Sequence, residues 1–262
     1  LTMHARNLSQ QDAEAAVTDA IRRGALVPSE ERYTTKQARG AEIRILGIEK
    51  ARRGAVAPVA PSEQVKQIMS GTTLNQGQRE SVEMILTAPD RFVGIQGFAG
   101  TGKSHMMSKA IEGIKAEAAR QGEAAGFKVV GLAPYASQNR ALEALGLKSG
   151  TLASFLARPA LQQEVDEKTI IFLDEASVVP AHQMAALMTV VERQQGRLVM
   201  LGDRKQTQAV EAGKPYEQLQ DAGMRVAYLT EIQRQKNETI KAAVVHAAHD
   251  RVGELETAAA LQ

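Results

Sequence analysis

Residues 97–104, GFAGTGKS, constrain the fold of this 262-residue chain more than any other stretch. The segment has two glycines separated by four residues, followed by Lys and Ser, which is the G-x-x-x-x-G-K-[ST] pattern of a phosphate-binding loop. The apolar residues 92–95 before it predict a strand, and the mixed polar and apolar residues 104–114 after it predict a helix. The alternative is an ordinary strand-to-helix turn that uses glycine for tightness. The complete pattern in this setting favours binding of a nucleoside triphosphate.

Each residue type in this loop has a separate chemical task. Glycines let backbone N–H groups approach anionic oxygens closely, and the start of the helix adds unpaired N–H groups and the positive end of a dipole. The Lys103 ammonium is expected near the β- and γ-phosphates, and the Ser104 hydroxyl is expected to bind Mg²⁺. The residues expected to contact the nucleotide in this loop are Gly97, Gly100, Thr101, Gly102, Lys103 and Ser104.

A second motif follows the apolar segment TIIFL, residues 169–173. Asp174 is expected to hold Mg²⁺, because this hard ion prefers oxygen ligands. Glu175 is placed to polarise a water for in-line attack on the γ-phosphorus. Alone, an Asp-Glu pair after a strand is often a solvated strand end. Together with the phosphate loop upstream, the pair predicts a nucleotide hydrolase.

Two later residues are candidates for sensing the γ-phosphate. Gln206 follows a strand that ends at Gly202 and Asp203, and a polar surface loop is the ordinary interpretation of such a segment. We prefer a sensor at Gln206 because its loop is expected at the same sheet edge as Asp174. Arg234 supplies a planar cation that can bind phosphate bidentately, although a lone Arg is more often a surface residue.

Nearly continuous apolar runs alternate with helical segments after residue 60. Such runs are typical of parallel strands covered on both faces, and the alternation predicts an α/β fold with a doubly wound, mostly parallel sheet. Ligands of such sheets bind at the carboxyl ends of the strands, where the phosphate loop falls. The expected strands are residues 92–96, 128–133, 169–174, 197–202 and 225–229.

The chain divides into three expected parts. Residues 1–60 predict a small helical unit, with one helix from a Ser9 cap through Ile21 and a second from about Thr35 to Arg52. Residues 54–61, GAVAPVAP, are expected to form a linker to the next part. Residues 61–236 are expected to form the nucleotide-binding lobe, and the alanine-rich residues 237–262 predict a helical extension.

Composition limits the classes of function. The formal net charge is +2, so a nucleic-acid site would have to be a local basic patch. The absence of cysteine excludes disulfides and thiolate metal sites, and no apolar run reaches the roughly 18 residues of a membrane span. We therefore expect a cytoplasmic protein without membrane insertion. Because the chain begins at Leu1 without an initiator methionine, we also expect it to be a fragment of a longer polypeptide.

The order of these motifs resembles that of superfamily 1 DNA helicases. The segments are LNQGQR (74–79), GFAGTGKS (97–104), APYASQNR (133–140), SGTLASFL (149–156), IFLDEAS (171–177), LGDRKQ (201–206) and EIQRQ (231–235). More narrowly, TLASFLARP, DEASVVPAHQM and AVEAGKPYEQLQDAGM resemble the helicase part of conjugative relaxase-helicases of the F-plasmid TraI type, which are RecD-like. The resemblance extends from about residue 33 to the carboxyl end.

This resemblance implies a RecA-like P-loop lobe that uses ATP and Mg²⁺ and moves 5′→3′ on single-stranded DNA. Gln78 would match the family's adenine-recognising glutamine, and Gln206 and Arg234 its γ-phosphate couplers. Small hydroxyls and backbone amides after two strands would hold sugar-phosphates without reading the base sequence. Tyr135 could stack a base or pack against the sheet. The implied DNA contacts are Pro134, Tyr135, Ser137, Thr151 and Ser154.

The sequence also departs from the family. Relatives continue past EIQRQ into a second motor lobe with an arginine finger, and nothing in this chain matches those motifs. The resemblance therefore implies a fragment that binds nucleotide weakly, hydrolyses it slowly and does not unwind DNA. The stretch between Ser154 and Thr169 leaves room for no more than a small hairpin where relatives carry a strand-separating element.

Other functions stay open. One is a RecD-type repair or recombination helicase, and another is a nucleotide-gated module without motor activity that recruits the conjugative transfer machinery. The segment EAGKPYEQLQ favours conjugation over repair. A small-molecule kinase is disfavoured because no acceptor-site motif accompanies the acids.

Overall fold

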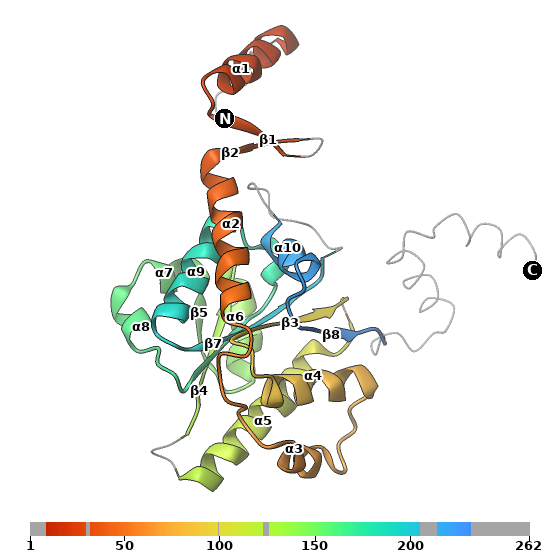
Figure 1. The fold of residues 1–262 in the computed structure, drawn as a ribbon. Helices are drawn as coiled ribbons and strands as arrows, with labels where there is room; N and C mark the ends of the chain where they lie inside the picture. The colour runs from red at the N-terminus through yellow and green to blue at the C-terminus, as the bar shows by residue number, and fades with distance from the viewer. Residues whose placement is uncertain (1–8, 30–31, 99, 123–125, 205–213, 232–262) are drawn as a thin grey trace, which may run out of the picture.

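The computed structural model describes residues 9–29, 32–98, 100–122, 126–204 and 214–231. Its main sheet consists of β3 (Phe92–Gly97), β4 (Lys128–Ala133), β5 (Lys148–Thr151), β6 (Thr169–Leu173), β7 (Arg197–Gly202) and β8 (Val226–Leu229). All neighbouring strands are parallel, and their order across the sheet is β5-β4-β6-β7-β3-β8 (Figure 1). The α/β fold with a doubly wound parallel sheet is confirmed.

The two faces of the sheet carry separate apolar cores, because successive side chains of a strand point to opposite faces. One face is covered by α3 (Ser62–Met69), α4 (Gln76–Thr87), α5 (Lys103–Gln121) and α6 (Ala136–Ala144), and the other by α2 (Lys36–Ala51), α7 (Leu152–Leu156), α9 (Ala181–Arg193) and α10 (Pro215–Asp221). In β6, Phe172 belongs to the first core and Ile171 to the second. Burial on both faces explains the continuous apolar strands. Among the described residues, no helix combines the length and the apolar character that crossing a membrane requires.

Strand β5 extends the sheet beyond the five expected strands. Its sequence, KSGT, is short and polar, and within the described sheet it pairs with β4 alone. The region between Ser154 and Thr169, where the sequence left room for at most a small hairpin, instead forms the end of α7 and the short helix α8 (Pro159–Gln163).

The N-terminal residues form the two expected helices and an unexpected hairpin. Helix α1 (Gln10–Arg22) begins after Ser9, whose hydroxyl oxygen accepts a hydrogen bond from the Asp12 N–H at 3.2 Å. Strands β1 (Leu26–Ser29) and β2 (Arg32–Thr35) pair antiparallel between α1 and α2. Helix α1 and this hairpin lie beyond the amino end of α2, away from the main sheet (Figure 1).

Helix α2 packs on the α/β body, although it precedes residue 60. It runs along α9, and Ile45 is 1% exposed in the core that it shares with Phe92 (Figure 1). Residues 54–61, expected as a linker, are also attached to the body. The Val59 N–H donates to the Leu86 carbonyl at 2.8 Å, and the Arg197 guanidinium donates to the carbonyl of residue 57. This segment is therefore part of the packed structure, which its small residues and prolines did not indicate.

Candidate functional site

The phosphate loop joins β3 to α5 at the carboxyl edge of the sheet. Gly100 and Gly102 have φ angles of 82° and 80°, in the left-handed region that glycine adopts most readily. A Cβ atom at Gly97 would lie 2.9 Å from the Thr101 hydroxyl oxygen and 3.0 Å from the Leu229 Cβ, so the strand end is closely packed. Among the residues that the structure describes, no side chain caps the start of α5, which leaves its first N–H groups for an anionic ligand.

Lys103 and the two acids after β6 act on one another electrostatically. The Lys103 ammonium donates a hydrogen bond to the Gly97 carbonyl at 3.0 Å. Burial raises the pKa of both the Asp174 and the Glu175 carboxyl, and the positive charge of Lys103 counters that rise in each case. The structure thus brings the phosphate loop and the acidic strand end together. A triphosphate and its metal ion require this combination of charges.

Glu175 has a strained backbone next to Asp174. Its φ of 49° lies in the left-handed region, which is rare for a residue with a side chain and is frequent at functional sites. Its N–H donates to Asp174 Oδ1 at 3.0 Å, and this bond lowers the pKa of Asp174 less than burial raises it. The sharp turn therefore holds two consecutive carboxyl groups at one strand end.

Asp203 and Gln96 belong to the same site. From the sequence, Asp203 was expected only to end a strand, and Gln96 had no expected role. The Gln96 Nε2 donates to Asp203 Oδ1 at 3.0 Å, and Gln96 Oε1 accepts from the Arg204 N–H at 3.1 Å. Asp203 is 2% exposed, and its charge raises the pKa of Glu175. The one signal in the sequence was a polar amide at the end of an apolar strand, directly before the phosphate loop.

Gln78 connects the phosphate loop to the start of α4. Its Nε2 donates to the Thr101 carbonyl at 3.1 Å, and its Oε1 accepts from the Asn75 N–H at 3.1 Å. The Asn75 side chain accepts from the backbone N–H of Gln78 at 2.9 Å, which completes a capping box. Gln78 is 2% exposed, so its amide is engaged with the protein itself. Recognition of adenine by Gln78 stays a prediction.

Oxygen donors suited to Mg²⁺ are present on two neighbouring elements. The Ser104 hydroxyl is exposed on the first turn of α5, and the Asp174 carboxyl follows β6. Hydroxyl and carboxylate oxygens fit this ion, which proteins usually bind through one or two carboxylates together with substrate phosphates. Within the described residues, no group of three or more His, Asp or Glu side chains could hold a metal ion by itself.

The candidate DNA contacts follow two adjacent strands. Strands β4 and β5 pair with Ala133 opposite Thr151, so the segments that begin at Pro134 and Thr151 leave the sheet side by side. Tyr135 is 59% exposed, which means that it does not pack against the sheet. The Thr151 hydroxyl oxygen accepts from the Ser154 N–H at 3.1 Å and thereby caps α7. Ser137 is exposed at the start of α6.

The candidate γ-phosphate residues Gln206 and Arg234 lie outside the described residues, and their roles stay predictions. Arg204 is the last described residue before Gln206. Its guanidinium pairs with Glu217 at 3.1 Å and with Asp221 at 3.0 Å, both on α10. Arg204 is therefore held against α10, next to Asp203.

Comparison with known proteins agrees with this geometry. The sequence profile described as AAA domain matches residues 73–262. The multifunctional conjugation protein TraI of Escherichia coli (strain K12) is 34% identical over 171 residues, which are 63% of this chain and 10% of that protein. The conjugal transfer protein TraA of Agrobacterium fabrum (strain C58 / ATCC 33970) is 36% identical over 193 residues, which are 72% of this chain and 16% of that protein.

This chain thus spans only a small part of either relative. A solved structure of two Pif1 helicases on forked double-stranded DNA is 19% identical, with a TM-score of 0.48 over 69% of this chain and 49% of that chain, too low a score to add to the assignment. The profile match, by contrast, covers most of the chain, including the phosphate loop and the acids after β6. The chain belongs to the AAA-domain family and is similar to part of the conjugation proteins TraI and TraA.

Proposed function

We propose that this chain is the ATP-binding first motor lobe of a 5′→3′ single-stranded DNA translocase and helicase of plasmid conjugation. The proposal is carried by the influence of the Lys103 charge on the pKa values of Asp174 and Glu175, which places the phosphate loop near both acids at the carboxyl edge of the sheet. Similarity to TraI and TraA supports conjugation as the process. In this proposal residues 61–236 are the motor lobe, residues 1–60 an N-terminal unit, and residues 237–262 an extension toward a second lobe of the parent chain.

The described residues suit distinct steps of ATP hydrolysis. The N–H groups of the phosphate loop and the Lys103 ammonium would hold the β- and γ-phosphates. Lys103 would then exchange its present hydrogen bond to the Gly97 carbonyl for a bond to phosphate oxygen. Ser104 and Asp174 would hold Mg²⁺, which neutralises charge on the phosphate oxygens. Glu175 would take up a proton from the attacking water, a task that a raised pKa favours. Gln206 and Arg234 would contact the γ-phosphate and sense its presence, and Gln78 would recognise the adenine.

Coupling to DNA would pass along the carboxyl edge of the sheet. The γ-phosphate site lies after β3, β6 and β7, and the candidate DNA contacts follow β4 and β5 in the same sheet. Binding of ATP would close a cleft against the second motor lobe, and hydrolysis would reopen it, which advances the strand. DNA binding through contacts with phosphates rather than bases would weaken with rising salt concentration and would not depend on base sequence.

An ATPase assay tests the proposal. We expect the 262-residue chain to bind ATP weakly and to hydrolyse it slowly, since an arginine finger of the kind expected from the second lobe contributes about 10³ to 10⁵ in rate in related enzymes. Lys103→Ala should abolish ATP binding, whereas Lys109→Ala, further along α5 in an exposed ion pair with Glu112, should not. Unchanged ATP binding by Lys103→Ala would refute the site. Strong stimulation of the wild-type chain by single-stranded DNA would refute the need for a second lobe.

Transfer by the full parent chain separates the motor from a docking module. If the parent with Lys103→Ala still supports conjugative transfer, ATP-driven movement is not its task, and the chain is a nucleotide-gated docking module of the transfer machinery. If the wild-type parent unwinds DNA in repair but has no part in transfer, the RecD-type alternative holds. We expect loss of transfer.

A further inference from the structure

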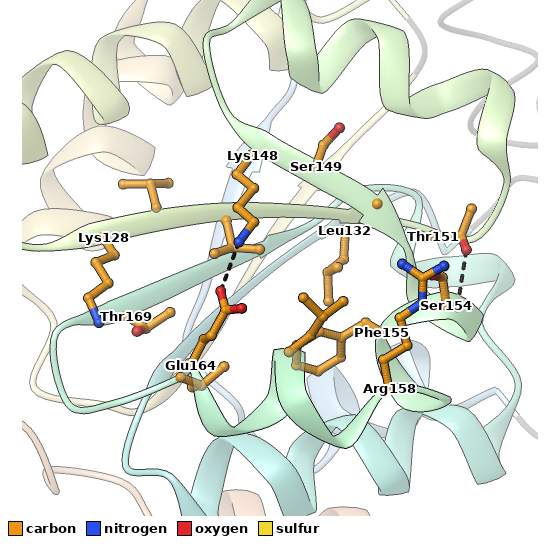
Figure 2. A pocket seen from close by; sticks show the side chains of 15 residues that line it. Lys128, Leu132, Lys148, Ser149, Thr151, Ser154, Phe155, Arg158, Glu164 and Thr169 are labelled. Atoms are coloured by element: carbon orange, nitrogen blue, oxygen red, sulfur yellow. Dashed lines mark hydrogen bonds and ion pairs between the residues drawn. The ribbon is translucent and has the colours of Figure 1, made fainter.

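A cavity of about 470 Å³ lies between strands β4 and β5 and the short helices α7 and α8 (Figure 2). Its walls are largely apolar and include Leu132, Phe155, Leu161 and Val165. Ligand pockets for small organic groups have volumes of about 300 to 1,000 Å³ and similar linings. Neither Lys103 nor the acids that follow β6 line it, so the cavity is separate from the nucleotide site.

One end of the cavity meets the candidate DNA contacts. Thr151 and Ser154 both line this end, and Figure 2 shows them next to Arg158. These residues follow β5, at the edge where the segment with Tyr135 also leaves the sheet. A DNA strand whose sugar-phosphates contact Thr151 and Ser154 would therefore carry its bases past this end of the cavity.

Among the described residues, the charges that line the cavity leave the guanidinium of Arg158 uncompensated. Lys128 pairs with Asp166 at 2.5 Å, and Lys148 pairs with Glu164 at 2.8 Å. Within the described part of the chain, the guanidinium of Arg158 has no ion pair and no hydrogen bond, and Arg158 is exposed at the cavity. An apolar cavity with one free guanidinium at its end complements a flat aromatic group that is linked to an anion. A nucleotide unit of single-stranded DNA has this chemistry.

The cavity can be entered at small cost. The ion pair of Lys148 with Glu164 spans it between β5 and the end of α8 (Figure 2). Both side chains are mostly exposed, 68% and 57%, and such surface pairs contribute little stability. Breaking this pair would widen the access between the edge strand and α8 without disturbing the apolar walls.

We propose that this cavity is a nucleobase pocket, in which one base of the bound strand inserts between β4 and α7–α8 while Arg158 pairs with an adjacent phosphate. The inference rests on the proposed function, because it takes single-stranded DNA as the ligand. It adds a pocket for one base to a surface where, apart from stacking on the exposed Tyr135, only sugar-phosphate contacts are expected. This contact would resist sliding of the strand when the nucleotide site is empty.

Binding of two oligonucleotides by matched variants tests the proposal. The probes are an oligothymidine of about ten nucleotides and an abasic oligomer of the same length. The wild-type chain should bind oligothymidine about tenfold more tightly, as stacking or insertion of one base allows. Leu161→Trp, which fills the cavity, should lower oligothymidine affinity to that of the abasic oligomer and leave abasic binding unchanged. Ala160→Trp, on the exposed side of the same helix, should behave as wild type.

The outcomes separate this inference from the proposed function. The chain has no tryptophan, so the emission of each introduced indole shows whether it is buried at position 161 and exposed at position 160. If Leu161→Trp does not fold, Leu161→Phe fills less of the cavity and should remove part of the preference. A preference that survives both variants but disappears in Tyr135→Ala overturns the pocket, and equal binding of the two probes does the same. Binding of neither probe overturns the strand contact and the proposed function with it.

Discussion

At the scale of single residues, Glu175 is subject to opposing electrostatic influences. Burial and the charges of Asp174 and Asp203 raise the pKa of its carboxyl, and Lys103 lowers it, with burial the largest effect. A carboxyl group with a raised pKa is a better proton acceptor, and the electrostatic cost of its charge is borne by the folded state. Function and stability are therefore expected to conflict at this residue.

Glu175→Gln is predicted to stabilise the fold and stop hydrolysis. Because the folded-state pKa is raised, the native state keeps a proton that the unfolded state releases, so wild-type stability falls as pH rises between the unfolded and the folded pKa. The glutamine side chain introduced by Glu175→Gln does not titrate, so the variant keeps the free energy of unfolding that the wild type loses with rising pH. It should be about 1 kcal/mol more stable at neutral pH, and the difference should vanish below the pKa that Glu175 has in the unfolded state. ATP turnover should fall about 10² to 10⁴-fold.

Denaturant unfolding at several pH values measures this stability difference. Glu167→Gln is the control, because Glu167 is exposed and should change stability by less than about 0.5 kcal/mol. A Glu175→Gln variant that is less stable than wild type at neutral pH would show that the surroundings stabilise the carboxylate, which contradicts a raised pKa.

Asp203→Asn is predicted to shift the pH dependence of hydrolysis. The charge of Asp203 raises the pKa of Glu175, so its removal should lower that pKa and move the acidic limb of the kcat profile to lower pH. An asparagine keeps an oxygen that can accept the hydrogen bond from Gln96, now at 3.0 Å, so the geometry should persist. A profile that loses amplitude without moving would mean that Asp203 acts through structure and not through charge.

The sequence predicted the phosphate loop and the acids because each is a contiguous motif with its own chemistry. It could not predict the bond of Gln96 to Asp203, since these residues are 107 positions apart and meet only because β7 lies directly beside β3. Alternating strands and helices predict a parallel sheet but do not determine its strand order. The engagement of Gln78 with Thr101 depends in the same way on tertiary packing.

At the scale of elements, the apolar strands were predictable and the short polar strand was not. Strands β3, β6 and β7 consist of apolar runs because helices cover both faces of the sheet. Of the two edge strands, β8 has the apolar sequence VAYL and was expected, whereas β5 has the polar sequence KSGT, which carries no strand pattern. Hairpin β1–β2 is short and contains Pro28, a residue that weakens the signal of a strand.

Two glycines on different helices are predicted to respond oppositely to the same substitution. A Cβ atom at Gly77 of α4 would lie 2.5 Å from the Tyr228 carbonyl oxygen of β8, whereas one at Gly47 of α2 would meet no atom of the described residues within 4 Å. Gly77→Ala should therefore cost about 1 to 3 kcal/mol, because backbone atoms must move apart. Gly47→Ala should gain about 1 kcal/mol from helix propensity. Chemical denaturation measures the free energy of unfolding of both variants. If Gly77→Ala leaves it unchanged, α4 and β8 pack less tightly than described.

At the scale of the whole molecule, α2 packs against the proposed motor lobe, although it precedes residue 61. Its Glu49 is 2% exposed and accepts from Arg53, whose Nη2 also donates to the carbonyl of residue 222 beyond α10 at 2.9 Å. Arg52 pairs with Glu192 of α9 at 2.8 Å. Contacts from α2 and the residues just after it thus reach both α9 and the end of α10, whereas α1 and hairpin β1–β2 lie beyond its amino end (Figure 1).

Truncation at two positions distinguishes a boundary before α2 from one after it. Removal of residues 1–34 keeps the Thr35 cap of α2, whose Oγ1 accepts from the Ala38 N–H at 3.0 Å, and should leave thermal unfolding of the lobe nearly unchanged. Removal of residues 1–60 uncovers α9 and Phe92. Loss of the buried Ile45 side chain alone should cost about 2 to 5 kcal/mol, by analogy with large-to-small core substitutions. If the shorter chain unfolds at the same temperature as the longer one, α2 is an accessory helix and the lobe begins after residue 60. If only the shorter chain is destabilised, the first helix of the motor lobe is α2, and any account of ATP-driven lobe closure must move it together with the sheet.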